Sequence, residues 1–303
     1  MHKIPVKDLS EFMRIEFKIE LNTPPHLTDV LITELDKNTK DTINWTNRPD
    51  IDWGKIDSAI LISPKNTETP PNCKTQVLKV ERPREVFTKI LRNFFEDITV
   101  KGISPNASIG DNCGIDADVH IGHNCVVGDN VSIGSGTTLD HGVIIHANTK
   151  IGRGCMLNSG CIIGGHGFGY EKIGHQYERI PHLGNVIIED RVEVGALTCI
   201  NRGTLGSTRI KSGVKIDDSS FVAHNVVVGL NTIICSHVVI CGSVTIGDNS
   251  WIAPGVMVRD GLEIGERAVL GMGSIVTKSV ESGTTVFGNP ARKKLPKQTD
   301  GKI

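Results

Sequence analysis

The sequence lacks the features that mark several large classes of protein. Its 33 Lys and Arg are balanced by 34 Asp and Glu, which leaves a formal net charge of −1 and no basic field of the kind that binds nucleic acid. No apolar run is long enough to cross a bilayer, and the polar start Met1–Asp8 has no signal-peptide core. We therefore expect a cytoplasmic protein without a transmembrane segment.

The eight cysteines do not form a recognisable framework. No two of them are separated by 18 residues, which is the spacing that would stack two residues in adjacent coils of a six-residue repeat. No Cys-x-x-Cys pair has the spacing of a zinc site either. We expect reduced thiols that fill small spaces in a core. Cys235 and Cys241 also lack an evident base that would make either of them a nucleophile.

What the chain does contain is a six-residue repeat of large aliphatic residues. Of 27 repeat positions, only Thr198 and Thr204 are not Ile, Leu or Val. Such a repeat indicates a solenoid, in which each unit buries its apolar face only against its neighbours. The first run comprises residues 103, 109, 115, 121, 127, 133, 139, 145, 151, 157 and 163, and the second comprises residues 186, 192, 198, 204, 210, 216, 222, 228, 234, 240, 246, 252, 258, 264, 270 and 276.

The period fits a parallel β-helix. Three hexads make one triangular coil of 18 residues, so residues 18 apart stack on one face at a spacing of about 4.8 Å. The step of 23 residues from Ile163 to Val186 is not a multiple of six, which predicts an excursion loop at 164–185. The fold class expected is therefore mainly β.

Three segments follow from the extent of the repeat. Residues 1–100 lack it and predict a small α/β domain, with strands at 59–63 and 75–80 and a helix at 82–95. Residues 101–280 form the β-helix, and residues 281–303 form a tail. Trp45 and Trp53 in the first domain either stack on a nucleotide base or belong to its core.

His224 is the strongest catalytic candidate because of what stacks on it. Gly242 lies 18 residues further on, one coil along the same face, and a glycine there exposes its backbone N–H. A base and a bare amide donor about one strand spacing apart suit acyl transfer. The imidazole would take a proton from an attacking amine, and the N–H would stabilise the negative oxygen.

Further motifs resemble one family of enzymes. The loop Gly167-Phe-Gly-Tyr170, the run Asp190–Ala196, Asn201-Arg-Gly203 and Ala223-His-Asn225 are similar to those of the UDP-3-O-acylglucosamine N-acyltransferases of lipid A biosynthesis, which are hexapeptide-repeat acyltransferases. The resemblance covers about residues 103 to 280. It implies a left-handed β-helix, an exception to the usual right-handed crossover, and a homotrimer with active sites between neighbouring prisms.

The resemblance also implies roles for single residues. His224 matches the general base, Gly242 the oxyanion donor, and Asp217 an acidic position expected to orient the histidine. Contacts to the nucleotide-linked sugar are expected from Trp45, Asn47, Phe168, Tyr170 and Asn225, and contacts to the acyl donor from Gly242, Ser243, Arg259 and Arg292. His166, where the family has Asp, and His237 receive no role.

Two departures from the family bear on the acyl donor and the substrate. Asn44 stands where the family has a Phe that stacks on uracil, and the Gly288–Arg292 ending resembles coenzyme A-dependent amino-sugar acetyltransferases. The interpretation placed first is an acyl-CoA-dependent N-acyltransferase that acts on a nucleotide-linked amino sugar in lipopolysaccharide or surface polysaccharide synthesis. The second is the acyl-carrier-protein-dependent lipid A step.

Two rival classes stay open on sequence grounds. A zinc lyase of the γ-carbonic anhydrase type shares this prism, and His123, His141 and His146 are spaced so that their imidazoles approach one another. A catalytically silent binding trimer is the other rival, against which the His224 and Gly242 pair argues. The expectation for the enzyme itself is that no metal is needed.

Overall fold

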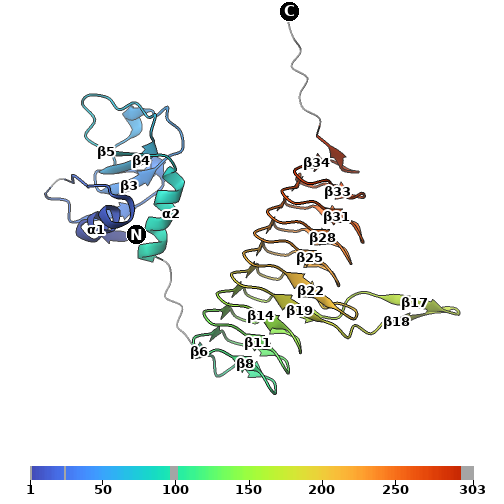
Figure 1. The fold of residues 1–303 in the computed structure, drawn as a ribbon. Coiled ribbons are helices and arrows are strands. Elements are labelled where there is room, and N and C mark those ends of the chain that lie inside the picture. Colours follow the sequence, from blue (N-terminus) through green and yellow to red (C-terminus); the bar gives the residue numbers. More distant parts are fainter. Residues whose placement is uncertain (1, 24, 96–101, 295–303) are drawn as a thin grey trace, which may run out of the picture. The chain divides into compact units, whose positions relative to one another are not determined.

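The computed structural model describes residues 2–23, 25–95 and 102–294, and it divides into units of residues 1–98 and 99–303 (Figure 1). The first unit is an α/β domain with a five-stranded sheet in the order β1-β2-β3-β4-β5, in which only β1 and β2 pair antiparallel. Its elements are β1 (Lys3–Pro5), α1 (Val6–Phe17), β2 (Asp29–Ile32), η1 (Leu35–Lys37), β3 (Thr42–Trp45), η2 (Trp53–Lys55), β4 (Ile60–Pro64), β5 (Gln76–Val80) and α2 (Pro83–Phe95).

Periodicity located the elements near the end of this domain. The expected strands at 59–63 and 75–80 correspond to β4 and β5, and the expected helix corresponds to α2. In α2, Pro83 begins the first turn and Val86, Phe87 and Ile90 form the buried stripe against the sheet. The helix α1, which buries Val6, Leu9 and Met13, was not predicted.

The second unit is a left-handed parallel β-helix, as predicted, with three sheets as its faces (Figure 1). The nine-stranded sheet contains β7 (Ser108–Ile109), β10 (Val126–Val127), β13 (Ile144–Ile145), β16 (Ile162–Gly165), β21 (Cys199–Asn201), β24 (Phe221–Val222), β27 (Val239–Ile240), β30 (Met257–Val258) and β33 (Ile275–Val276). The eight-stranded sheet contains β8 (Gly114–Ile115), β11 (Ser132–Ile133), β14 (Lys150–Ile151), β19 (Asn185–Ile188), β22 (Ser207–Ile210), β25 (Val227–Val228), β28 (Thr245–Ile246) and β31 (Glu263–Ile264). The 11-stranded sheet contains β6 (Gly102–Ile103), β9 (His120–Ile121), β12 (Thr138–Leu139), β15 (Met156–Leu157), β20 (Glu193–Val194), β23 (Lys215–Ile216), β26 (Ile233–Ile234), β29 (Trp251–Ile252), β32 (Val269–Leu270), β34 (Thr285–Phe287) and β35 (Arg292–Lys293).

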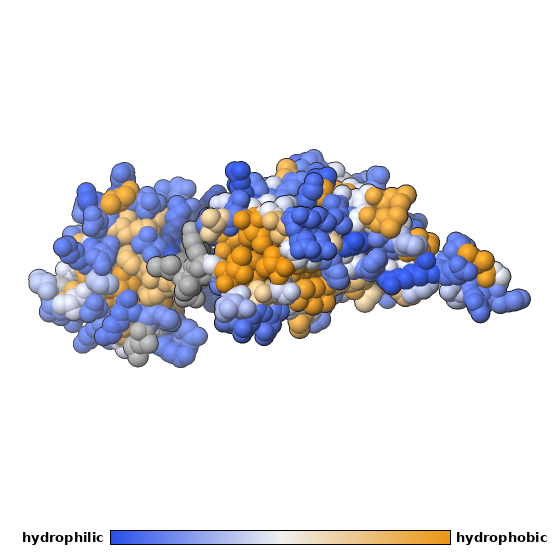
Figure 2. Space-filling model, turned by 90° about the horizontal axis from the view of Figure 1, so that it is seen from below, coloured by the Kyte–Doolittle hydropathy of each residue, from blue (hydrophilic) through white to orange (hydrophobic). Residues whose placement is uncertain are grey.

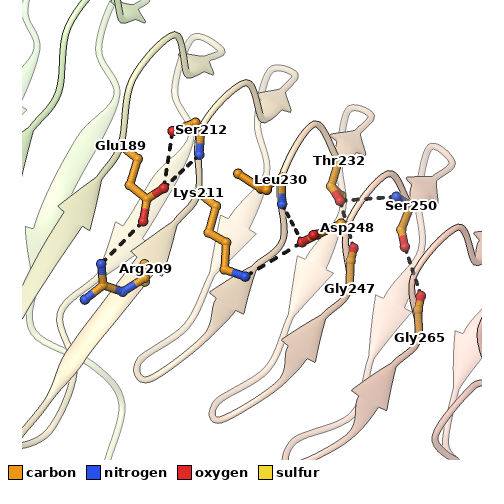
Figure 3. Close-up of polar contacts among 10 residues, drawn as sticks. All are labelled: Glu189, Arg209, Lys211, Ser212, Leu230, Thr232, Gly247, Asp248, Ser250 and Gly265. Atoms are coloured by element: carbon orange, nitrogen blue, oxygen red, sulfur yellow. Dashed lines mark hydrogen bonds and ion pairs between the residues drawn. The ribbon is translucent and has the colours of Figure 1, made fainter.

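Coils stack with the 18-residue register that the repeat predicts. Val127 pairs with Ile145 in the next coil, and both side chains are buried in the prism. Polar side chains tie successive coils together, as Figure 3 shows for the later coils. There the Thr232 hydroxyl donates to Gly247 O (3.0 Å) and the Asp248 carboxylate accepts from the Leu230 N–H (2.8 Å).

The start of the second run was predicted in the wrong register. Ile163 pairs with Ile200 rather than with Thr198, and Ile188 then pairs with Ile210, so ten residues separate Ile200 from Ile210 instead of six. The expected positions 186, 192 and 198 are buried, but they occupy the second inward position of each hexad, two residues before the strand aliphatic. Thr204 belongs to a second, short departure from the prism, which we call the 201–206 insertion.

The predicted excursion exists and forms a hairpin that projects from the prism (Figure 1). It comprises β17 (Tyr170–Ile173) and β18 (Gln176–Arg179), which pair antiparallel. At its base the Ile180 N–H donates to Gly169 O (2.9 Å), and the returning Leu183 N–H donates to Thr204 O (2.7 Å). The excursion is therefore fixed to the 201–206 insertion.

The two ends of the prism differ. At the C-terminal end the sheet continues past residue 280, because β34 joins the 11-stranded sheet and β35 folds back on it. At the other end the inward residues of the first coil are less buried, and Ile103 keeps half of its surface exposed. Figure 2 shows hydrophobic surface gathered on this part of the prism. No helix in residues 2–23, 25–95 and 102–294 combines the length and hydrophobicity that a bilayer crossing requires.

Candidate functional site

The candidate site lies on one edge of the prism, where the nine-stranded sheet turns into the eight-stranded sheet. The coils of β13, β21, β24, β27 and β30 place His146, Arg202, His224, Gly242 and Arg259 in the turns of this edge, which we call the His224 edge. Each of these turns follows a two- or three-residue strand whose inward side chain is buried, so the core fixes the turns in space. Side chains far apart in the sequence therefore meet along a single line.

His224 and Gly242 are brought together as the stacking predicted. A Cβ added to Gly242 would lie 2.7 Å from Cε1 and 2.8 Å from Nε2 of His224, so the imidazole covers the space that a side chain at Gly242 would occupy. The two turns are also joined by a hydrogen bond from the Ser243 N–H to His224 O (2.9 Å). Within the described residues, the Gly242 N–H donates to no hydrogen-bond acceptor, which leaves it available to a ligand.

Asn225 fixes the orientation and the tautomer of His224. Its Oδ1 accepts from the Thr204 N–H (3.0 Å) and the Thr204 hydroxyl (3.1 Å), and lies 3.1 Å from Nδ1 of His224. Because a backbone N–H can only donate, the Asn225 atom that faces Thr204 must be the oxygen, and His224 must present a proton on Nδ1 to it. The Nε2 of neutral His224 is then unprotonated and able to accept a proton.

Asn225 thus supports the base, whereas the sequence placed it among the sugar contacts. The 201–206 insertion has a function in this arrangement, because the extra residues carry Thr204 across to Asn225. Asn225 adopts φ 60°, a left-handed conformation that Asn tolerates better than most residues. Sequence periodicity could not reveal this contact, since it depends on where the register is interrupted.

The excursion covers His224 with a second histidine that the sequence did not indicate. The His182 ring is 2% exposed, and its centroid lies 5.1 Å from that of His224 at an interplanar angle of 66°. Gly167 lies against both rings, since an added Cβ would be 2.5 Å from Nε2 of His182 and 3.0 Å from Cδ2 of His224. Next to it, Phe168 is 83% exposed and contacts Tyr170 edge to face at 4.9 Å.

Three basic side chains, those of Arg202, His146 and His166, flank His224 and Gly242 on the N-terminal side of the prism. Arg202 donates from Nε to Gly164 O (2.6 Å) and from an Nη to Ala147 O (3.1 Å), and burial lowers its pKa. Burial, followed by the charges of Arg202 and His166, lowers the pKa of His146. Burial and then Arg202 lower the pKa of His166 in the same way. Because a lowered pKa favours the neutral form of both histidines, Arg202 is the fixed cation of this group, and a cation beside a base suits an anionic ligand.

The orienting role expected of Asp217 is not supported by its position. Asp217 follows β23, so it lies on the edge where the 11-stranded sheet turns into the nine-stranded sheet, at the other end of β24 from His224. Its Oδ1 accepts from the Asp218 N–H (2.9 Å). The exposed His237 lies on that same edge, and its N–H donates to Asp218 O (3.2 Å).

The residues expected to contact the acyl donor extend from Gly242 toward the C-terminal end. Arg259 is exposed in the coil after Cys241, and Arg292 is exposed on β35. Arg292 lines a cavity of about 330 Å³ together with Lys278 and Lys293. These positions agree with a donor that extends from Gly242 toward the C-terminal end of the prism.

The proposed sugar contacts of the first domain occupy different environments. Trp45 packs parallel to Phe87 of α2, 5.9 Å between ring centroids, and belongs to the apolar core of the domain. That contact accounts for Trp45 without a ligand. Asn47 is exposed, and Asn44 is buried with its amide donating to Thr33 O (2.8 Å). Trp53 instead lines two cavities of about 880 Å³ and 500 Å³.

The histidine set that suggested zinc is not assembled in this chain. His123 and His141 stack at 5.2 Å on the edge before the nine-stranded sheet, whereas His146 lies on the His224 edge. In the part of the chain that the structure describes, no group of three or more His, Cys, Asp or Glu is placed to hold a metal ion. The three-imidazole expectation was therefore wrong, because the intervening strand separates the edges.

The cysteines do not supply an activated nucleophile. All eight thiols are free, and Cys125, Cys155 and Cys161 are buried in the prism. Burial raises the pKa of Cys161 to about 12 and also raises the pKa of Cys235 and Cys241. A thiol whose pKa is raised is a poor nucleophile near neutral pH.

The repeats match a known family model. Residues 106–141 and 243–278 match the bacterial transferase hexapeptide model of six repeats. Both matched stretches lie in the prism domain, one before and one after the excursion. Among solved structures, this domain is similar to the UDP-N-acetylglucosamine O-acyltransferase of Moraxella catarrhalis, with 29% identity, a TM-score of 0.58, and coverage of 63% of this chain and 73% of that one. LpxA from Acinetobacter baumannii gives 25% identity, the same TM-score and the same coverage.

Two curated relatives that are similar to the prism share one name. The UDP-3-O-acylglucosamine N-acyltransferase of Wolinella succinogenes is 40% identical over 129 residues, which is 42% of this chain and 41% of that protein. The protein of the same name from Desulfotalea psychrophila is 48% identical over 132 residues, 43% of this chain and 38% of its own length. The chain thus spans about two-fifths of the length of these relatives. The resemblance drawn from the sequence is confirmed.

Proposed function

We propose that this protein is an N-acyltransferase that moves an acyl group from a thioester to the amine of UDP-3-O-acylglucosamine. The observation that carries the proposal is the stacking of His224 on Gly242, with Asn225 directing the proton of His224 to Nδ1. This leaves one proton acceptor and one amide donor in adjacent coils. Acyl transfer to an amine needs both groups at one reacting carbon.

The chemistry follows from these two groups. The amine nitrogen attacks the thioester carbonyl carbon, and a C–N bond forms while the carbonyl oxygen becomes negative. The Gly242 N–H donates to that oxygen, and Nε2 of His224 takes the proton that the amine must lose. When the tetrahedral intermediate collapses, the C–S bond breaks and the imidazolium returns the proton to the departing thiolate. The products are an amide and a free thiol.

The choice of acceptor rests on the relatives. Two proteins that are 40% and 48% identical to this chain are named for UDP-3-O-acylglucosamine. Arg202, which is held on the His224 edge by its hydrogen bonds to Gly164 O and Ala147 O, supplies a cation that agrees with an acceptor that carries a diphosphate. The lipid A reaction, which sequence reasoning placed second, therefore becomes the first choice, and a different nucleotide-linked amino sugar becomes the second.

The donor that we place first is acyl carrier protein, because the resemblance links that donor to the lipid A reaction. Acyl-CoA is the alternative. Both donors present the thioester on a phosphopantetheine arm, so the exposed Arg259 and Arg292 suit the phosphate of either one. An assay with each donor distinguishes the two possibilities.

The test combines two acceptors with two donors. The purified chain is incubated with UDP-3-O-acylglucosamine or UDP-N-acetylglucosamine, each with an acyl-carrier-protein thioester or with acyl-CoA, and products are identified by mass spectrometry. We expect a new amide only with the free amine, and faster with the carrier-protein thioester. Acylation of the UDP-N-acetylglucosamine hydroxyl instead would contradict the proposal, and a faster reaction with acyl-CoA would reverse the choice of donor.

We further propose that the prisms assemble as a homotrimer through the nine-stranded sheet. From β10 onward, the outward residue that directly precedes the inward aliphatic of each strand is apolar or cysteine, and Val126 and Met257 are 45% and 49% exposed. The full outward series is Val126, Ile144, Ile162, Cys199, Phe221, Val239, Met257 and Ile275. A continuous apolar face on a soluble prism is typical of a protein interface.

The outward face of the eight-stranded sheet provides the contrast, since it carries Lys150, Arg209 and Glu263. Because His224 follows β24 of the apolar sheet, assembly through that sheet places each site at a seam between copies. Light scattering on the purified chain should give the mass of three copies, and Val239→Glu should lower it. A monomeric wild-type protein at micromolar concentration would contradict this assembly.

A further inference from the structure

His182 is anchored in the excursion by one of its two ring nitrogens. It follows β18 on the arm that returns to the prism, and its Nδ1 lies 2.9 Å from Ile180 O. A carbonyl oxygen can only accept, so Nδ1 carries a proton. In the neutral ring, Nε2 is therefore an unprotonated acceptor.

The other nitrogen has no partner. Nε2 of His182 is buried and makes no hydrogen bond to any residue that the structure describes. A buried polar atom left without a partner is unfavourable, because it has given up its hydrogen bonds to water and gained none in return. Packing alone does not require a nitrogen there, because an apolar side chain of similar size would fill the space without that cost.

What lies beside this nitrogen is the proposed base. The rings of His182 and His224 meet edge to face at 5.1 Å, with the Gly167 backbone against both of them. The unprotonated nitrogen is the negative end of the imidazole dipole. A Cβ on Gly167 would lie 2.5 Å from Nε2 of His182 and 3.0 Å from Cδ2 of His224, so the nitrogen and the proposed base face the same glycine. During acyl transfer His224 becomes a cation, and a fixed negative dipole end next to it favours that cation.

We infer that His182 is a positioning residue, which holds the plane of the His224 ring over Gly242 and stabilises its protonated form through the unpartnered Nε2. The inference rests on the proposed function, since it assigns His182 a part in the same proton transfer. His182 itself is too buried to touch the substrate. Its effect passes through His224 alone.

Two variants separate the roles of the two nitrogens. In His182→Asn the side-chain amide nitrogen takes the place of Nδ1 and keeps the bond to Ile180 O, but nothing replaces Nε2. In His182→Gln the amide extends to the place of Nε2. We expect His182→Asn to melt close to wild type and to lose at least about tenfold in kcat with KM unchanged, and His182→Gln to recover part of the loss.

Each outcome decides between the alternatives. A His182→Asn protein with wild-type kcat would show that the ring is only an anchor, and an increase in KM alone would show a substrate contact; either result overturns the inference. Wild-type protein without any acyl transfer would instead refute the proposed function. A measurement that needs neither variant nor turnover is the imidazole ¹⁵N spectrum of the wild-type protein near neutral pH. We expect one buried histidine protonated on Nδ1 alone, and a proton on Nε2 of His182 would overturn the inference.

Discussion

Replacing Asn225 by glycine tests how the proposed base is oriented. The substitution removes the oxygen that accepts from Nδ1 of His224 (3.1 Å) and from the N–H and hydroxyl of Thr204 (3.0 and 3.1 Å). Glycine accepts the φ of 60° at this position without strain, so the change is confined to the side chain. Loss of the one hydrogen bond that orients the His224 ring should raise the activation free energy of acyl transfer by about 0.5–1.5 kcal/mol.

That free energy corresponds to a kcat lower by about twofold to tenfold, because each 1.4 kcal/mol is about a factor of ten. KM should stay constant, since Asn225 is turned toward Thr204 and His224 rather than toward the substrate. The control is Asn225→Asp, which keeps an oxygen for all three contacts and should retain the melting temperature. The assay is steady-state N-acylation at saturating donor. A folded Asn225→Gly enzyme with unchanged kcat and a raised KM would refute the reasoning and restore Asn225 to the sugar contacts.

Two further predictions concern single contacts. Gly242→Ala should lower kcat by about 10²-fold or more, because the added methyl would lie 2.7 Å from Cε1 of His224 and the ring must move; Gly114→Ala, whose methyl meets nothing within 4 Å, is the matched control for activity and melting. The Ser159 hydroxyl, which donates to Asp140, is the largest cause of the lowered pKa of that carboxyl, and Asp140 therefore stabilises the fold above its ordinary pKa of 3.8 and loses this effect as pH falls below it. Ser159→Ala should be less stable than wild type to urea near neutral pH, and the difference should shrink in acid; a difference that persists in acid would point to lost packing instead.

The fold could be predicted because the six-residue repeat identifies the residues that form the core. Each hexad aliphatic from Ile121 to Ile163, and again from Ile210 to Val258, faces inward and pairs with the residue 18 further on or across the excursion. The register failed between Val186 and Thr204, where a hexad has two inward positions and either can be mistaken for the other. Thr198 was one sign of this error, since threonine occurs at the second inward position, as at Thr137 and Thr232. Thr204 was the other sign, because it lies in the 201–206 insertion and not at an inward position.

The site was predictable only where it depends on stacking. His224 and Gly242 are 18 residues apart in an uninterrupted run, so the repeat alone brings them together. His182 and Thr204 reach the same place through the excursion and the 201–206 insertion, whose paths follow from hydrogen bonds and not from any period. Asp217 illustrates the opposite error. It is only seven residues from His224 in the sequence, but β24 lies between them and places the two residues on different edges of the prism.

The central claim is that Nε2 of His224 accepts the proton of the attacking amine. The most direct measurement is the single-turnover rate of N-acylation for His224→Ala, with nucleotide-sugar binding measured on the same protein by calorimetry. We predict binding close to wild type and a rate lower by at least about 10²-fold. A rate within a few-fold of wild type, with binding intact, would contradict the claim and require another base.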